Sequence, residues 1–129
     1  MTDRLLEGRR ILVVENDSDT LQMLKFILEQ NGADVVATDS VPAALHQFGS
    51  QHPDVVLADI AMPGLNGYAL ITEIRRMDAE RNGYTKAIAV TAFSTPRDED
   101  LAAASGFDAY VTKPFDPGAL VQTMLEVIG

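Results

Sequence analysis

The chain has 129 residues, which fits one domain with a substantial apolar core. Its net charge of −9 and its lack of a basic patch argue against direct binding to nucleic acid. It has no cysteine for disulfides, thiol catalysis or zinc binding, no apolar run that could span a membrane, and no secretory signal at its N-terminus. We therefore expect a cytoplasmic protein that contacts neither nucleic acid nor membrane directly.

Short apolar segments alternate along the chain with segments of helical periodicity. Leu21, Leu24, Ile27 and Leu28 keep a spacing of about 3.6 residues, while the apolar segments are nearly continuous and favour strands buried on both faces. Thr95 followed by Pro96 is typical of a helix start, and Gly32 and Gly106 are typical of helix ends. In chain order we predict strand 10–14, helix 18–31, strand 33–37, helix 40–49, strand 54–58, a helix opening at 66–67, strand 86–91, helix 95–106, strand 108–112 and a helix beginning at 116–117.

Five strand and helix units in a row predict an α/β fold with helices on both faces of a parallel sheet. The expected architecture is flavodoxin-like and doubly wound, with five parallel strands in the order 2-1-3-4-5. Ligands of such folds bind at the carboxyl ends of the strands, beside the point where strand order reverses. Functional residues should therefore follow the first, third, fourth and fifth strands.

Polar side chains do follow these strands. Glu15, Asn16 and Asp17 follow the first strand, Asp59 follows the third, and Thr91 and Lys113 close the fourth and fifth. Three carboxylates, an amide, a hydroxyl and an ammonium could thus converge on one shallow pocket. Carboxylates held together need a cation, and oxygen ligands without His or Cys suit Mg²⁺. A carboxylate facing a lysine and a hydroxyl is a plausible site of phosphoryl transfer.

Other side chains that could bind a ligand have simpler interpretations. His46 and His52 lie away from the predicted pocket, and we expect both on the surface. Met23, Met62, Met77 and Met124 are better explained as core residues than as part of a cofactor site.

From about residue 10 to 128 the sequence resembles the receiver domain of two-component response regulators. The resemblance rests on "ILVVEND", "VVLADIAMPGLNGYAL", "AIAVTA" and "DAYVTKPF", which occur in this order and with the spacing of that family. It implies a single receiver domain over 1–129 that takes a phosphoryl group from a histidine kinase or a histidine phosphotransfer domain. Such a domain is a signalling module rather than an enzyme, with Mg²⁺-dependent self-phosphorylation and self-dephosphorylation only.

The resemblance also implies roles for individual residues. Asp59 is the expected phosphoacceptor; Thr91 and Lys113 would contact the phosphoryl group. Glu15, Asn16, Asp59 and the backbone carbonyl of Ala61 would hold Mg²⁺. Tyr110 would turn inward on activation, and the Lys113–Pro114 bond would be cis. The face made by the fourth helix, fifth strand and fifth helix, about 93–128 with Phe93 and Pro96, would bind the downstream partner.

Asn16 departs from the family, which usually has Asp at this position. Its amide can ligate Mg²⁺ but carries no charge, so affinity should fall; alternatively, Asn16 only caps the first helix. Asp17, a third acid, would compensate only indirectly.

Three questions of function and context remain open at this point. A degenerate receiver would act as an interaction module without phosphorylation. A flavin-binding protein of the same fold is disfavoured by the acidic "ENDSDT" loop, which would repel a phosphate. The chain could also be a stand-alone receiver or one excised from a hybrid kinase.

Overall fold

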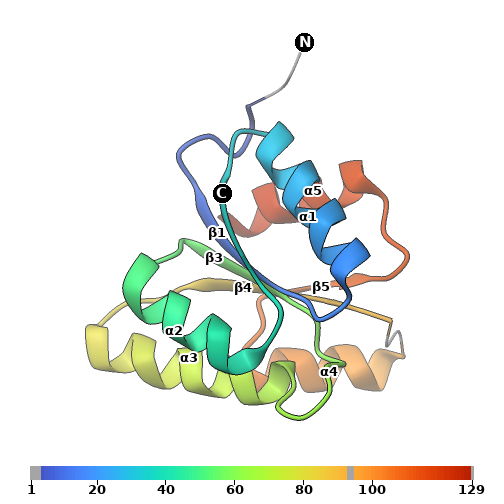
Figure 1. The fold of residues 1–129 in the computed structure, drawn as a ribbon. Coiled ribbons are helices and arrows are strands. Elements are labelled where there is room, and N and C mark those ends of the chain that lie inside the picture. The colour runs from blue at the N-terminus through green and yellow to red at the C-terminus, as the bar shows by residue number, and fades with distance from the viewer. Residues whose placement is uncertain (1–3, 93–94, 129) are drawn as a thin grey trace.

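The computed structural model describes residues 4–92 and 95–128 and contains one parallel sheet (Figure 1). Its five strands pair in the order β2-β1-β3-β4-β5, which confirms the predicted doubly wound topology. The strands are β1 Arg10–Val14, β2 Asp34–Thr38, β3 Val55–Ala58, β4 Lys86–Thr91 and β5 Ala109–Thr112.

Five helices cover the two faces of this sheet. They are α1 Ser18–Gln30, α2 Val41–Gln51, α3 Gly67–Arg81, α4 Pro96–Ser105 and α5 Pro117–Ile128. Helices α1 and α5 lie on one face and α2, α3 and α4 on the other (Figure 1). Side chains alternate between faces along a strand, so Leu12 and Val14 pack toward α2 and α3 while Ile11 and Val13 pack toward α1 and α5.

The central strands are buried on both faces, as predicted for β1, β3 and β4. The prediction was wrong for β2 and β5, whose residues are mostly half-buried or exposed. Both are edge strands, so each has a neighbouring strand on one side only. The central strands therefore form the buried middle of the sheet, and Glu15 and Asp59 of the predicted site directly follow two of them.

The helix boundaries follow local capping interactions. Thr95 and Asp98 form the capping box that begins α4, and Asp116 accepts a hydrogen bond from the Ala119 amide at the start of α5. Gly32 and Gly106 follow α1 and α4 with positive φ, as predicted. Helix α2 runs past Gly49 to Gln51, which is longer than predicted.

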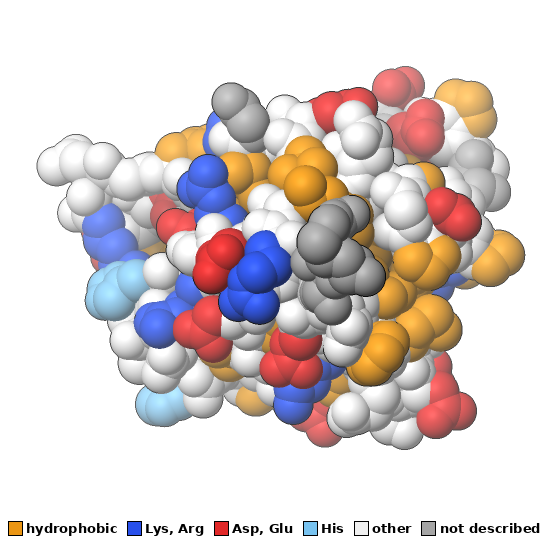
Figure 2. Space-filling view, turned by 90° about the horizontal axis from the view of Figure 1, so that it is seen from above, with side chains coloured by type: hydrophobic (Ala, Val, Ile, Leu, Met, Phe, Trp, Pro, Cys, Tyr) orange, Lys and Arg blue, Asp and Glu red, His pale blue; other side chains and the backbone are white. Residues whose placement is uncertain are grey.

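One methionine does not belong to the core. Met62 and Met124 are buried and Met77 is half-buried, but Met23 is 48% exposed, so its assignment to the core was wrong. Met23 and Phe26 are exposed on the outward side of α1. Figure 2 views the molecule from the side of α1 and α5 and shows that hydrophobic side chains reach this surface. His46 and His52 are exposed, as expected.

Within the described ranges, no helix is both long enough and apolar enough to cross a bilayer.

Candidate functional site

The carboxyl ends of β1 and β3 place two acidic residues side by side. Val14 pairs with Ala58 in the parallel ladder, so the next residues, Glu15 and Asp59, leave the sheet together. The Asp59 amide donates to the Val14 carbonyl at 3.0 Å, which extends the ladder by one residue. Glu15 and Asp59 are only 1% and 6% exposed. Two neighbouring carboxylates that are buried from water repel each other, so they require a positively charged partner.

Lys113 supplies that positive charge. Its Nζ lies 2.6 Å from Glu15 Oε2 and 3.0 Å from Asp59 Oδ2, so the ammonium bridges the two carboxylates. The backbone fixes its position, because Thr91 pairs with Thr112 and the Lys113 amide donates to the Thr91 carbonyl at 2.8 Å. The Lys113–Pro114 peptide bond is cis, as the resemblance implied. Three strands thus bring the ion triad together from distant parts of the sequence.

Each carboxylate also accepts a backbone hydrogen bond on its second oxygen. The Asp17 amide donates to Glu15 Oε1 at 3.1 Å, and the Ala61 amide donates to Asp59 Oδ1 at 2.9 Å. Each acid is therefore held between a lysine and a loop amide. This fixes the orientation of the Asp59 carboxylate before any ligand arrives.

The electrostatics of the triad follow from burial and pairing. Burial raises the pKa of Glu15; the hydrogen bonds from Lys113 and the Asp17 amide oppose this rise, and the charge of Asp59 adds to it. For Lys113, burial would lower the pKa, but the hydrogen bonds to Glu15 and Asp59 outweigh it, so the pKa is raised. Lys113 is consequently a stable ammonium, and with both acids ionised the triad keeps one net negative charge.

Asn16 and Asp17 follow Glu15 directly, and their side chains lie in different surroundings. Asp17, not Asn16, caps α1: its carboxylate accepts from the Thr20 amide at 3.0 Å and from the Thr20 hydroxyl at 2.5 Å. These hydrogen bonds lower the pKa of Asp17. The prediction that three carboxylates converge was therefore wrong, since the third is turned to the helix N-terminus. Asn16 is exposed beside Glu15 and is not the N-cap residue.

Thr91 and Tyr110 lie on neighbouring strands beyond the triad. Thr91 is completely buried at the end of β4, and Tyr110 is half-buried on β5, where it packs against the core formed with α2, α3 and α4. Burial, and next the charge of Asp98, raise the pKa of Tyr110. Tyr110 borders residues of α4, including Glu99 and Ala103, at the surface. Phe93, which was predicted on that surface, lies outside the described residues.

The loop after Asp59 depends on a glycine whose role the sequence did not reveal. A Cβ on Gly67 would lie 2.7 Å from Ile60 Cα and 2.8 Å from the Asp59 carbonyl oxygen, both too close for any side chain. The Gly67 amide donates to the Ile60 carbonyl at 3.1 Å, and Asn66 caps α3. Gly67 therefore lets α3 pack directly against the backbone that carries Asp59. In the sequence, the Asn-Gly pair indicated only a turn and a helix start.

The donor atoms fit a hard divalent cation. Glu15 and Asp59 offer carboxylate oxygens and Asn16 an exposed amide oxygen, and Mg²⁺ accepts a few such ligands together with water. The ammonium of Lys113 already bridges this pair of acids. Over residues 4–92 and 95–128, no group of three or more Asp, Glu, His or Cys side chains is placed so that it could hold a metal ion by itself.

A shallow pocket lies beside Lys113. It has a volume of about 390 Å³ and is mainly apolar, lined by Thr20, Met23, Ala92, Lys113, Pro114 and Phe115. The exposed Met23 of α1 forms part of this lining. The ion triad therefore borders an accessible apolar surface.

Known proteins are similar to this chain in sequence and in fold. The family model described as the response regulator receiver domain matches residues 11–125. The "uncharacterized 14.6 kDa protein in sodA1 3′ region" of Leptolyngbya boryana is 38% identical over 87% of this chain and 84% of its own length. The phosphate regulon transcriptional regulatory protein PhoB of Escherichia coli is 34% identical over 94% of this chain. The sensor histidine kinase GacS of Pseudomonas protegens is 34% identical over 93% of it.

The chain spans 52% of PhoB and 13% of GacS. Among solved structures, the response regulator receiver domain protein from Clostridium thermocellum has a TM-score of 0.83 at 29% identity, covering 93% of this chain and 94% of its own. Sequence and fold agree along nearly the whole chain, which therefore belongs to the response regulator receiver domain family of two-component signalling systems.

Proposed function

We propose that Asp59 is the phosphoacceptor of this receiver domain. Receiver domains interact with histidine kinases and generally depend on Mg²⁺. The observation that supports Asp59 most directly is the Lys113 ammonium, which is held 3.0 Å from its carboxylate while the Ala61 amide fixes the other oxygen. A fixed carboxylate beside a permanent cation is suited to attack an anionic phosphoryl group.

The reaction is a phosphoryl transfer from a phosphohistidine. An Asp59 oxygen forms a bond to phosphorus while the bond from phosphorus to the imidazole nitrogen breaks, and the imidazole keeps that electron pair. Lys113 moves its charge from the free carboxylate to the phosphoryl oxygens, and the buried Thr91 hydroxyl donates to one of them. Glu15, Asn16, Asp59 and the Ala61 carbonyl would hold Mg²⁺, which when bound neutralises phosphoryl oxygens.

The donor is a histidine kinase or a histidine phosphotransfer domain, and the reaction takes place in the cytoplasm, where such kinases draw on ATP. The apolar pocket with Met23 and Phe115 supports an approach over α1 and the segment after β5, because a docked donor there would border Lys113. The whole chain, 1–129, acts as a single domain. Apart from this transfer, its only chemistry is Mg²⁺-dependent self-phosphorylation from small phosphodonors and self-dephosphorylation.

The response to phosphorylation is a packing change around β5, which lies on the other side of β4 from β3 and Asp59. Movement of Thr91 toward the phosphoryl group would open space for Tyr110 to turn inward, which would alter the face of α4, β5 and α5 that meets the downstream partner. Adding beryllofluoride with Mg²⁺ should shift amide resonances both near Asp59 and around Tyr110. Shifts confined to the Asp59 pocket would contradict this coupling.

Phosphorylation distinguishes this proposal from a degenerate receiver. Retention of the ion triad supports an active phosphoacceptor, because a phosphate-independent module would not need a buried carboxylate held beside a lysine. The deciding experiment is intact mass spectrometry after incubation with acetyl phosphate and Mg²⁺. Gain of one phosphoryl group that maps to Asp59 supports the proposal, whereas an unlabelled protein favours the degenerate receiver.

A further inference from the structure

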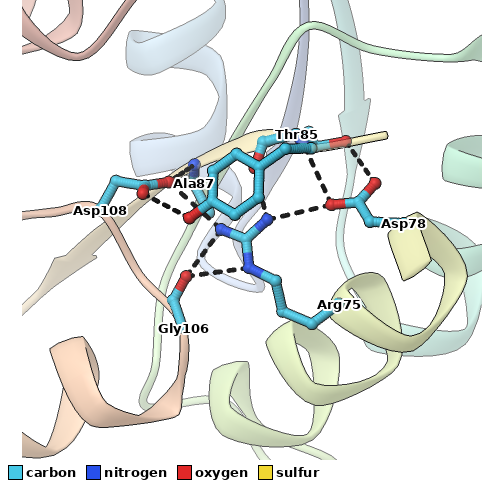
Figure 3. Close-up of polar contacts among 7 residues, drawn as sticks. Arg75, Asp78, Thr85, Ala87, Gly106 and Asp108 are labelled. Carbon is cyan, nitrogen blue, oxygen red and sulfur yellow. Dashed lines mark hydrogen bonds and ion pairs between the residues drawn. The ribbon is translucent and has the colours of Figure 1, made fainter. Parts of the chain in front are cut away.

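A second polar cluster lies at the opposite end of the sheet from Asp59. It gathers around Arg75 of α3, close to the points where β4 and β5 begin (Figure 3). Asp78, on the next turn of α3, is only 5% exposed. The cluster contacts none of the residues of the ion triad, so phosphoryl transfer itself gives no reason for it.

Arg75 uses its guanidinium to join three segments. Its Nε and Nη2 both donate to the Gly106 carbonyl, at 3.1 and 2.7 Å, and its Nη1 donates to the Thr85 carbonyl at 2.6 Å. It also forms ion pairs with Asp78 at 3.0 Å and Asp108 at 3.2 Å. Figure 3 shows the guanidinium between these groups. A planar fork with several donors can hold this geometry, whereas a lysine could not.

The two carboxylates are themselves fixed. Asp78 accepts from the amide and the hydroxyl of Thr85, both at 2.9 Å. Asp108 accepts from the Ala87 amide at 2.8 Å and from the Tyr84 hydroxyl at 2.6 Å. The ring of Tyr84 lies 4.0 Å from the Arg75 guanidinium carbon. Arg75 is therefore held in one orientation by partners that are each anchored to the backbone.

The segment that depends most on Arg75 is the C-terminal end of α4. Gly106 caps this helix, and a Cβ at Gly106 would lie 3.2 Å from Arg75 Cγ, so the absence of a side chain permits the close approach. Within α4 itself Ala102 is the one buried residue, and Phe107, which follows Gly106, is also buried in the core. Its N-terminal cap is made within its own segment, between Thr95 and Asp98. The helix is thus anchored at one end by charged hydrogen bonds and lightly packed along its length.

We propose that Arg75 makes the C-terminal end of α4 a fixed pivot, so that phosphorylation of Asp59 moves the N-terminal half of α4 while Gly106 stays in place. The proposal rests on the proposed phosphoacceptor function and specifies which part of the output face responds. The N-terminal half follows β4 and Thr91, whereas the C-terminal end is fixed to α3 and to the start of β5. Arg75 is a positioning residue here, because it does not touch the reacting atoms.

The anchoring can be tested in the unphosphorylated protein by amide hydrogen exchange. The amides of Gly106 and Phe107 close the last turn of α4 by donating to the Ala103 and Ala102 carbonyls. In Arg75→Met these two amides should exchange about tenfold faster than in the wild type, relative to amides of β1 and β3. Arg75→Lys should give an intermediate increase, and it serves as the test if Arg75→Met does not fold.

The matched control is Arg76→Met on the same helix. Arg76 is exposed and pairs only with Glu73 and Glu80 in the described chain, so its loss should leave the exchange of Gly106 and Phe107 unchanged. Equal exchange at Gly106 and Phe107 in the wild type, Arg75→Met and Arg75→Lys would overturn the anchoring role.

The pivot itself is tested by amide shifts on addition of beryllofluoride and Mg²⁺. In the wild type the shifts should fall along α4 from Asp98 to Ser105 and be small at Gly106, whereas in Arg75→Lys they should extend through Gly106 and Phe107. Shifts near Asp59 with equal changes at both ends of α4 would contradict the pivot alone. No shifts anywhere in the wild type would contradict the proposed phosphoacceptor function.

Discussion

Lys113 and Asp59 are 54 residues apart in sequence, yet Nζ of Lys113 and Oδ2 of Asp59 lie 3.0 Å apart. The same ammonium lies 2.6 Å from Glu15, so one lysine neutralises part of the charge of two buried acids. The lysine is thus in place before a phosphoryl group arrives. Its charge offsets those of the two carboxylates and would be available to a phosphoryl group on Asp59.

Removing this ammonium should have opposite effects on stability and on metal binding. In Lys113→Met two buried carboxylates lose their cation, which should lower the free energy of unfolding by about 2–3 kcal/mol, less than for a fully buried pair because Lys113 is partly exposed. Mg²⁺ should then bind more tightly, because no ammonium competes for the two acids. Urea unfolding with and without Mg²⁺ measures both effects, and Lys25→Met, which removes a lysine of α1 that forms no ion pair among the described contacts, is the control. Weaker Mg²⁺ binding in Lys113→Met would contradict this account of the site.

Asn16→Asp should tighten Mg²⁺ binding. The new carboxylate would restore a charge beside Glu15, and the net gain should be about 1–2 kcal/mol after desolvation and repulsion, roughly tenfold in affinity. The metal-free protein should become slightly less stable, since three acids would then repel one another. Ser18→Asp, which adds the same charge at an exposed position nearby, should have a smaller effect. Superimposable Mg²⁺ titrations of the wild type and Asn16→Asp would show that Asn16 takes no part in metal binding.

Asp17→Ala should destabilise the domain without preventing phosphorylation. The Asp17 side chain caps α1, and loss of an N-cap costs about 1 kcal/mol. Asn16→Ala should cost less, because Asn16 caps nothing. Urea unfolding of both variants distinguishes the two neighbours. An equal or larger loss of stability in Asn16→Ala would mean that the capping residue has been assigned wrongly.

The convergence of Glu15, Asp59 and Lys113 was predictable, because parallel strands in a known order bring their carboxyl ends to one edge. The contacts that each side chain makes at that edge were not predictable. That Asp17 turns away to cap α1 depends on loop geometry, which spacing alone does not determine. Met23 does not lie on the same helix face as Leu21 and Leu24, and only its apolar side chain suggested that it belonged to the core.

Two other features required the tertiary structure. The contact of Gly67 with Ile60 joins a helix to a loop, and the Arg75 cluster joins three segments whose approach no local pattern encodes. Local sequence therefore predicts which residues leave the sheet at the site, whereas packing between loops and helices decides how those residues are held.

Gly67→Ala should disturb the Asp59 loop. Its Cβ would collide with the Ile60 backbone, so α3 or the loop must shift, at a cost of about 2–3 kcal/mol and with slower labelling of Asp59. Gly83→Ala is the matched control, because a Cβ at Gly83 meets nothing within 4 Å. Urea unfolding and the rate of labelling by acetyl phosphate measure the two effects. Equal behaviour of the two variants would contradict the close approach of Gly67.

The central claim is that Asp59 is the phosphoacceptor, and the most direct measurement is intact and peptide mass spectrometry after incubation with acetyl phosphate and Mg²⁺. The wild type should gain one phosphoryl group that maps to Asp59, and chelation of Mg²⁺ should prevent this gain. Asp59→Asn should remain folded and unlabelled, because an amide keeps the shape of the side chain but cannot accept the phosphoryl group. Labelling that persists in Asp59→Asn, or that maps to another residue of the wild type, would contradict the claim.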